Sequence, residues 1–384
     1  MIFNLKDLFV FSKNKRKNSK YVQFLMFCVI FLCIFGCFMV YSASSYNALK
    51  HYGSSTFFLK KQIIGCFIGF VSLIFFSFFD YQKLKRFRWV ILIISVVGLL
   101  FVFVPGIGFA NYGARRWIRI LGLSFQPSEL AKFALVLFCA SYLSDNYKKI
   151  KNFRKILPPI FVGGVLCLLV ILEPNMSITM CLALTLVVML VVGGISKKHF
   201  SILSGLGACA VPALIVAEPY RIKRLVAFVD PWANPKGEGF QLIQSLYALG
   251  NGGLFGVGLF NSRQKYLFLP FSESDFIFSI IGEELGLLGS IFVLFVFAVM
   301  IYCIIKIGLR AKNRFGCLLC TGIASVIATQ VALNVAVVTG SIPPTGLPLP
   351  FISAGSTSLV VFMSAIGVVL NINKQSKSRV WGSA

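Results

Sequence analysis

The chain has 384 residues, of which 58% are hydrophobic and 13% are charged. Its mean hydropathy of +0.86 excludes an ordinary soluble domain and indicates a protein that crosses a membrane many times. The formal net charge of +25 is explained by membrane topology and by attraction to anionic lipids, so we expect no nucleic-acid partner.

Ten apolar runs are long enough to cross a bilayer, which takes roughly 17 to 25 residues. We therefore predict an all-α, polytopic membrane protein with about ten transmembrane helices over residues 21–372. A basic tail, 1–20, precedes the first run, which is too long for the core of a cleaved signal peptide. A second tail follows at 373–384. The ten predicted helices lie near 21–42, 62–79, 88–104, 128–144, 156–172, 177–195, 200–217, 284–306, 315–337 and 353–372.

The basic residues give an independent check on the topology, because cytoplasmic loops carry the excess of Lys and Arg. With the N-terminus in the cytoplasm, 24 of the 37 basic residues fall on the cytoplasmic side and twelve on the outer side, while Lys132 lies within a span. This distribution predicts an even number of helices and two cytoplasmic termini.

The cysteines do not indicate a disulfide framework or a metal site. All 11 fall inside predicted helices, and the chain has only two histidines. A zinc or haem site built by the protein is therefore not expected, and neither is an organic cofactor.

The first long outer loop, 105–127, carries Arg115, Arg116 and Arg119. Basic residues on the outer side are exceptions to the rule that Lys and Arg are enriched in cytoplasmic loops. A bound anion such as a phosphate or pyrophosphate head group would suit them, because guanidinium groups match phosphate oxygens in pairs. Ordinary contact with lipid head groups is the alternative.

The fourth predicted helix contains an acid and a base within the membrane. Glu129 and Lys132 are three residues apart, so they lie on one face and can neutralise each other. A structural ion pair and a functional site are both compatible with this spacing. Farther along, Gln330 and Asn334 in the ninth helix fit hydrogen bonds between helices better than ligand binding.

The second long outer loop, 218–274, is predicted to lie between the seventh and eighth helices. It carries Arg221, Lys223 and Arg224, which extend the outer basic cluster. Residues 240–249 have apolar side chains on one side and predict an amphipathic helix in the membrane interface. The following glycines, at 250–258, fit either close approach of a substrate to the backbone or tight packing of a re-entrant loop.

Four of the twelve acidic residues fall at the start of the eighth helix. A carboxylate beside hydrocarbon is costly unless it is paired, hydrated or functional, which makes Asp275 the strongest candidate for chemistry. Glu283 and Glu284 are expected at the outer edge of this helix. On one continuous helix Glu284 would point away from Asp275, so a compact cluster of these acids is not expected.

Several separated motifs together carry a resemblance to a known family. The chain is similar, over nearly its whole length, to the SEDS family of cell-wall glycosyltransferases, and its details resemble the division-type members more than the elongation-type members. The motifs are NYGARRWIRILGLSFQPSELAKFAL, YRIKRLVAFVDPWANPKGEGFQLIQSLYALGNGGLFGVGL, SDFIFSIIGEELGLLG and TGLPLPFISAGSTSL.

This resemblance implies a polymerase of lipid II at the outer face of the bacterial cytoplasmic membrane, at the division septum. Asp275 matches the essential aspartate of the family, with a role as general base or as an orienting group assisted by Mg or Mn. The implied partners are a class B penicillin-binding transpeptidase and other divisome membrane proteins. Glu283 is expected to support the site, and the expected substrate-binding residues are Arg115, Arg116, Trp117, Glu129, Lys132, Arg221, Arg224 and Ser353.

The chain departs from the family pattern at two places. LPEAHTDF appears as LPFSESDF, with Phe271 and Glu273 substituted, and PFISYGGSS appears as PFISAGSTS, with Ala354 and Ser356 substituted. These changes bear on the shape of the acceptor pocket.

Two alternative functions remain open from the sequence. One is an elongation-type polymerase. The other is a lipid II flippase, for which Pro158, Pro159 and Pro212 would be possible helix breaks.

Overall fold

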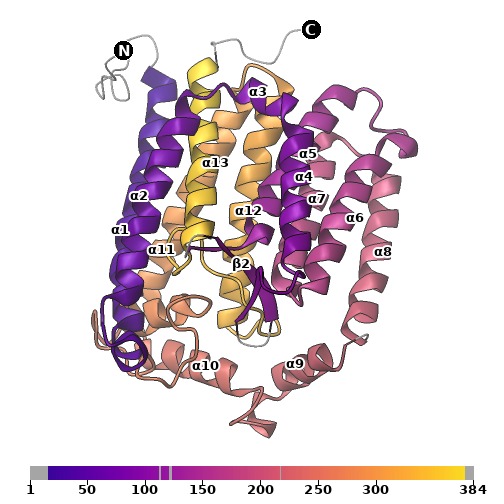
Figure 1. Ribbon diagram of the computed structural model, residues 1–384. Helices are drawn as coiled ribbons and strands as arrows, with labels where there is room; N and C mark the ends of the chain where they lie inside the picture. Colours follow the sequence, from indigo (N-terminus) through magenta and orange to yellow (C-terminus); the bar gives the residue numbers. More distant parts are fainter. Residues whose placement is uncertain (1–15, 112–113, 121–122, 217, 377–384) are drawn as a thin grey trace.

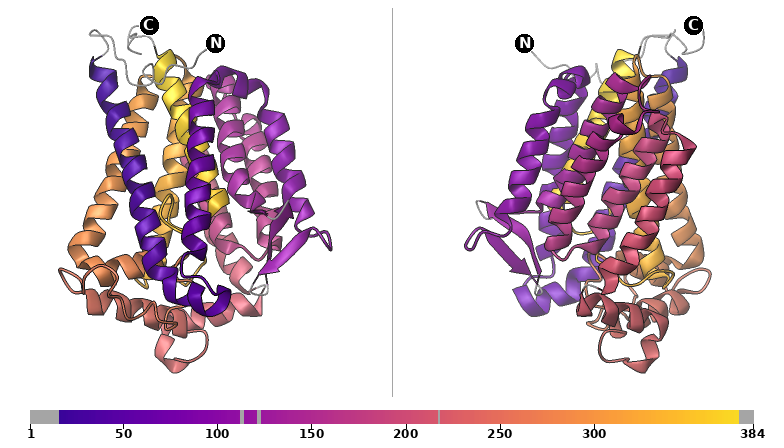
Figure 2. Two further views of the ribbon diagram at one scale, coloured as in Figure 1. Left: turned by 60° about the vertical axis from the view of Figure 1, so that its left-hand side comes forward. Right: turned by 90° about the vertical axis from the view of Figure 1, so that its right-hand side faces the viewer.

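The structure of the protein is a computed structural model that describes residues 16–111, 114–120, 123–216 and 218–376. Long helices run side by side between the two ends of the molecule (Figures 1 and 2). The first described helix begins, and the last described helix ends, at the same end. At the opposite end, shorter helices, a small sheet and several loops cover the bundle (Figure 1).

The predicted transmembrane helices are all present in the described part of the chain, which confirms the all-α, polytopic fold. Six have the length and hydropathy of a membrane span, namely α1, α2, α7, α11, α12 and α13. The helices α4 and α6 are apolar but shorter, and α5 and α8 carry charged residues. Their bounds are α1 Arg16–Tyr52, α2 Phe57–Phe78, α4 Arg88–Phe101, α5 Pro127–Asn146, α6 Leu157–Leu172, α7 Met176–Gly193, α8 Lys197–Val216, α11 Ile277–Leu309, α12 Arg314–Val338 and α13 Ser356–Gln375.

The first and last helices extend beyond the predicted spans, and two of the predicted helix breaks are wrong. Helix α1 already begins at Arg16, inside the predicted first tail, and α13 continues to Gln375. Residues 1–15 and 377–384 lie outside the described residues. Pro158 and Pro159 lie in the first turn of α6, where proline is tolerated, so they do not break a helix.

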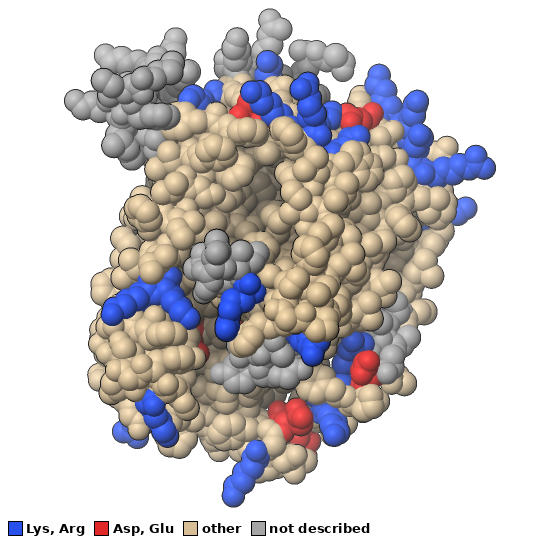
Figure 3. Space-filling model, viewed as in Figure 1, with Lys and Arg blue, Asp and Glu red and all other residues tan. Residues whose placement is uncertain are grey.

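The surface supports a transmembrane arrangement. Lys and Arg gather in two groups near the two ends of the molecule, with a wide band of uncharged residues between them (Figure 3). Between the two groups, large apolar side chains are exposed, including Phe67, Phe161 and Phe295. A hydrocarbon layer would cover such a band, since the apolar area far exceeds what soluble monomers expose.

Close contacts between helices depend on small residues. Helix α13 packs against α2, and α12 packs against α5, α7 and α11. At Gly367 on α13, any side chain would collide with the backbone of Leu73 on α2. Lipid tails are as apolar as the side chains, so the hydrophobic effect does not drive helices together within a membrane. Close approach of the backbones, which increases van der Waals contact, is therefore a main source of packing energy.

The first long outer loop forms a three-stranded antiparallel sheet, which the sequence analysis did not predict. Its strands are β1 Gly108–Asn111, β2 Ala114–Ile120 and β3 Leu123–Phe125, in the order β1-β2-β3. Because successive side chains of a strand point to opposite faces, this sheet sorts the arginines of the loop into two groups.

The second long outer loop contains two helices that lie across the end of the bundle (Figure 1). They are α9 Pro219–Val229 and α10 Phe240–Gly252, and α10 confirms the predicted amphipathic helix. The buried side is broader than predicted and includes Ser245 and Ala248. The Ser245 hydroxyl donates to the carbonyl of Val338 at 2.7 Å, so this polar residue ties α10 to α12.

The glycine-rich segment packs against a kink in α11, and the prediction of a continuous helix there is wrong. Gly286 has φ 69° and ψ −167°, which interrupts the helix. The amide of Val257 donates to the carbonyl of Glu283, and that of Gly258 to the carbonyl of Glu284, each at 3.0 Å. At Gly252 and Gly256 a side chain would collide with the backbone of α11, so these two glycines permit the tight packing of the loop.

Candidate functional site

Asp275 lies in the turn just before α11, at the end of the bundle that carries the sheet and α9. Asn334 of α12 holds this turn, because its side-chain amide donates to the carbonyl of Asp275 at 2.8 Å and to that of Leu347 at 2.7 Å. The hydroxyl of Ser353 donates to the carbonyl of Ser274 at 2.6 Å. Two segments about 70 residues apart in the sequence are thus joined around Asp275.

The loop between α12 and α13 lies directly against the carboxylate of Asp275. A side chain added at Gly346 would place its Cβ 2.6 Å from Oδ2 of Asp275, so the carboxylate would have to move to make room for it. The amide of Ala354 donates to the carbonyl of Glu273 at 2.9 Å. Glu273 and Ala354, which both depart from the family pattern, are therefore neighbours at this site.

The environment of Asp275 makes its carboxylate more basic than usual. Burial raises the pKa of Asp275 from 3.8 to about 6, with a further contribution from the negative charge of Glu273. The positive charges of Arg116 and Arg224 oppose this rise in pKa. At pH 7 the carboxylate is mostly ionised yet is a stronger proton acceptor than an exposed aspartate, as a general base requires.

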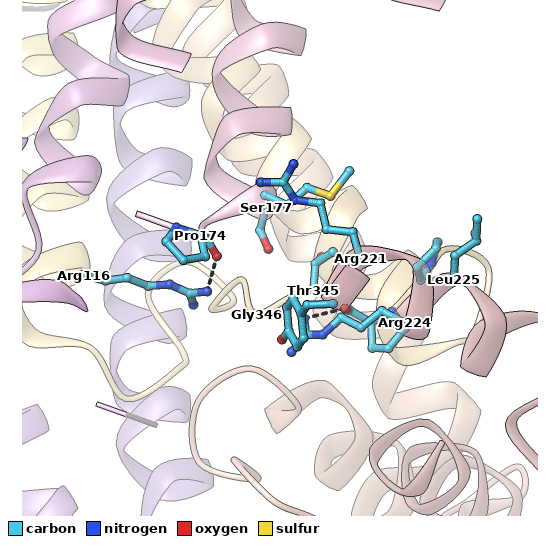
Figure 4. A pocket seen from close by; sticks show the side chains of 12 residues that line it. Arg116, Pro174, Ser177, Arg221, Arg224, Leu225, Thr345 and Gly346 are labelled. Carbon is cyan, nitrogen blue, oxygen red and sulfur yellow. Dashed lines mark hydrogen bonds between the residues drawn. The ribbon is translucent and has the colours of Figure 1, made fainter. Parts of the chain in front are cut away.

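Three arginines line a pocket (Figure 4). The pocket adjoins Asp275 through Gly346, which lines it and lies against the Asp275 carboxylate. Arg116 enters it from β2, and Arg221 and Arg224 enter it from α9. Arg224 donates to the carbonyl of Pro344 at 2.9 Å and stacks over the ring of Tyr220, 4.5 Å from its centroid. The other lining residues are Pro174, Met176, Ser177, Leu225, Pro343, Thr345 and Gly346.

The alternation of β2 separates the residues of the RRWIR motif. Arg116 is half-buried and reaches the pocket, whereas Arg115 and Arg119 are exposed. Arg119 instead lies over the ring of Phe109, 4.3 Å from its centroid. Trp117 follows the same outward alternation as Arg115. The structure therefore places Arg116 at the pocket but not Arg115 or Trp117.

Glu129 and Lys132 form a fully buried ion pair with a separation of 2.9 Å. Lys132 also donates to Gln330, whose amide donates to the carbonyl of Pro348 at 2.8 Å. The pair does not line the pocket. It contacts the loop beside Asp275 through Gln330, which favours the structural alternative.

Glu283 and Glu284 are fully buried and lie in α11 just before its kink at Gly286. Glu283 accepts hydrogen bonds from the hydroxyl of Ser262 and from the amide of Arg263. Glu284 pairs with Lys265 at 3.0 Å. Both acids hold the loop that leads to Asp275, so the supporting position of Glu283 is structural.

The sequence analysis missed Glu173, in the turn between α6 and α7. Arg116 donates to the backbone carbonyls of Glu173 and Pro174. The side chain of Glu173 is fully buried, and burial raises its pKa to about 8. The available signal was an acid directly after an apolar run, the same signal that identified Asp275.

These features define a multi-pass membrane protein with a basic pocket beside a buried carboxylate of raised pKa at one end of its helix bundle. Residues 23–378 match the FtsW/RodA/SpoVE family, described as cell cycle proteins. The chain belongs to this family, which is the SEDS family named above.

Individual relatives agree with this assignment. The chain is 39% identical to stage V sporulation protein E of Bacillus subtilis over 92% of this chain and 97% of that protein. It is 38% identical to a probable peptidoglycan glycosyltransferase FtsW of Geobacter sp. over 94% of this chain and 99% of that protein.

Solved structures share the fold. A chain from a peptidoglycan synthase complex that coordinates polymerization and crosslinking has 27% identity and a TM-score of 0.76, covering 92% of this chain and 98% of that chain. The rod shape determining protein RodA of Thermus thermophilus has 22% identity and a TM-score of 0.68, covering 92% of this chain and 97% of that chain.

Proposed function

We propose that this peptidoglycan glycosyltransferase polymerises lipid II, with Asp275 as its catalytic residue. The observation that carries the proposal is a carboxylate with a pKa of about 6 beside a pocket lined by three arginines. The same arrangement suits both halves of the reaction, because one substrate must lose a proton and the other must release a pyrophosphate.

In the proposed reaction, the Asp275 carboxylate accepts the proton of the acceptor sugar hydroxyl. The hydroxyl oxygen forms a new bond to the anomeric carbon of the donor, and the bond from that carbon to the pyrophosphate oxygen breaks. Arg116, Arg221 and Arg224 bind the departing lipid-linked pyrophosphate, whose negative charge their guanidinium groups stabilise.

A Mg or Mn ion fits this site as a helper. Among the described residues no group of three His, Cys, Asp or Glu side chains could enclose a metal by itself. Magnesium is commonly bound by one or two carboxylates together with substrate phosphates, and Asp275 with the nearby Glu273 offers such a partial set. The ion would supply positive charge to the leaving pyrophosphate.

The proposed location is the bacterial cytoplasmic membrane at the division septum, with the Asp275 end outside and both termini in the cytoplasm. The excess of basic residues in the loops at the terminal end supports this orientation. The similarity to proteins named FtsW supports a role in division, together with other divisome membrane proteins. An elongation-type polymerase remains the alternative within the same family.

The pyrophosphate pocket can be tested by a pair of neighbouring substitutions. We expect Arg116→Ala to raise the KM for lipid II roughly 10- to 100-fold, since a hydrogen bond to a charged group is worth about 1.5–3 kcal/mol. Arg115→Ala removes the same charge from the exposed side of β2 and should leave KM near the wild-type value. Steady-state kinetics with fluorescent lipid II measure both. An unchanged KM for Arg116→Ala would remove Arg116 from the pocket's function.

A groove between α11 and α12 suits the transmembrane helix of a class B penicillin-binding transpeptidase, the proposed partner. Helix α12 presents Ala328, Ala332 and Ala336 to the groove at intervals of four residues. Small residues at this spacing allow close helix contact within a membrane. The coordination of polymerization and crosslinking in the similar synthase complex supports the same partnership.

The role of the groove in binding the partner can be tested by a substitution that fills the groove with a larger side chain. We expect Ala332→Phe to reduce co-purification of the cognate transpeptidase roughly tenfold, a loss of about 1.4 kcal/mol, because the ring would prevent close approach of the partner helix. Leu168→Phe, at an exposed position on α6, adds the same ring elsewhere and should have no effect. Undiminished co-purification with Ala332→Phe would place the partner on another face.

A further inference from the structure

Glu173 is a buried acid that the proposed reaction does not use. Its side chain is 0% exposed, and neither of its carboxylate oxygens has a hydrogen-bond partner among the described residues. Its neighbour in space is Arg116, which donates to the backbone carbonyl of Glu173 at 3.3 Å and to that of Pro174. An ionised carboxylate without hydrogen bonds is costly in such a place, so the side chain must either stay neutral or take its charge partner from Arg116.

The charged groups around Glu173 leave Arg116 as its partner. Of the described groups, Arg116 on β2 is the one whose charge acts on Glu173. Arg116 is in turn influenced by Asp275 and by Tyr220 and Arg224 from α9.

The buried charges on α5 do not change this picture. On α5, Glu129 and Lys132 neutralise each other. The guanidinium of Arg116 thus interacts electrostatically with two acids, Asp275 and Glu173, and also lines the pocket for an anion.

We propose that uncharged Glu173 leaves the positive charge of Arg116 to the pyrophosphate of the substrate, whereas ionised Glu173 competes for that charge. Glu173 is then a positioning residue that sets the upper pH limit of substrate binding. This inference rests on the proposed function, since it takes the arginine-lined pocket to be the pyrophosphate site. It assigns a role to a residue that touches neither the sugar nor the reacting atoms.

The direction of the pH effect follows from linkage. Burial raises the pKa of Glu173 to about 8, so the residue is protonated at neutral pH. An anion bound at Arg116 favours the protonated form further. The affinity for the anion is therefore at its maximum below pH 8 and decreases above pH 8. For one linked proton it decreases by at most roughly tenfold per pH unit. Asp275, with a pKa of about 6, titrates in a separate range.

Binding of inorganic pyrophosphate to the full chain in detergent micelles tests the proposal between pH 7 and 9.5. An Asp275→Asn background removes the titration of Asp275, and Glu173→Gln is added to it. The ratio of the two affinities at each pH cancels the protonation of pyrophosphate itself. We expect the background to lose roughly tenfold more affinity than the Gln variant as the pH rises from 8 to 9.5.

Two further variants complete the design. Glu173→Met is a second uncharged replacement in case Glu173→Gln does not fold, and Glu238→Gln removes an exposed acid at the same end and should behave like the background. Identical pH profiles with and without Glu173 would overturn its role while leaving the pocket in place. No pyrophosphate binding by any variant at any pH would overturn the proposed pocket, and this inference with it.

Discussion

Asp275→Asn is expected to abolish glycan-chain synthesis and to leave the protein folded in the membrane. Asparagine keeps the shape of the side chain but cannot accept the proton of the acceptor hydroxyl. General-base catalysis contributes on the order of 10²- to 10⁴-fold, so the rate should fall by at least that range. The fold should persist because the turn is held through the backbone carbonyls of Ser274 and Asp275, which the substitution leaves unchanged.

The assay uses purified protein, its cognate transpeptidase and fluorescent lipid II in liposomes. Asp230→Asn is a matched control on the same side of the molecule. Asp230 accepts from the amides of Trp232 and Ala233, a capping role that asparagine also fills. Normal glycan synthesis by Asp275→Asn would refute the assignment of the base. If neither wild type nor variant made chains and both moved lipid II between leaflets, the flippase would be the better description.

Lys265→Met is expected to destabilise the protein by about 3–5 kcal/mol. Lys265 is 4% exposed and pairs with Glu284, which is fully buried, at 3.0 Å. It also donates to the hydroxyl of Ser42, so the pair joins α1, α11 and the loop that leads to Asp275. Removing one partner leaves an uncompensated buried charge, which costs far more than the pair itself contributes.

Thermal unfolding in detergent measures this effect. The double variant Lys265→Met/Glu284→Gln should recover much of the loss, because glutamine carries no charge yet still accepts from Ser42 and from the amide of Ser262. Lys236→Met, at an exposed position of the same outer loop, should change stability by less than about 0.5 kcal/mol. Equal stability of Lys265→Met and wild type would show that the pair is dispensable.

The kink in α11 could not be predicted from the sequence pattern. The apolar run correctly located the helix, and the acids before it correctly marked an unusual place. A helical projection nevertheless assumed one straight helix, whereas α11 is kinked next to Glu283 and Glu284 and both acids are buried. The kink at Gly286 and the re-entrant glycines that pack into it follow from contacts with residues 253–258, which local periodicity does not report.

The arginines of the first outer loop show the same limit. Their abundance on the outer side predicted an anion site, and the resemblance supplied the chemistry of the expected anion. The separation of Arg116 from Arg115 required knowing that the loop is a β-sheet. Glu173 gained its place beside Arg116 from the packing of β2 against the α6–α7 turn, 57 residues away in the sequence.

By itself, the sequence determined the membrane class and the positions of the long helices, and it predicted the orientation in the membrane and the role of Asp275. These properties follow from hydrophobicity and charge summed along the chain, because a bilayer imposes the same solvent boundary on every segment. The tertiary structure alone decided which charges meet. Whether Lys132 reaches Gln330, Glu284 pairs with Lys265 or Arg116 contacts the turn at Glu173 depends on distances between different segments of the chain, and electrostatic interaction depends on those distances and on burial.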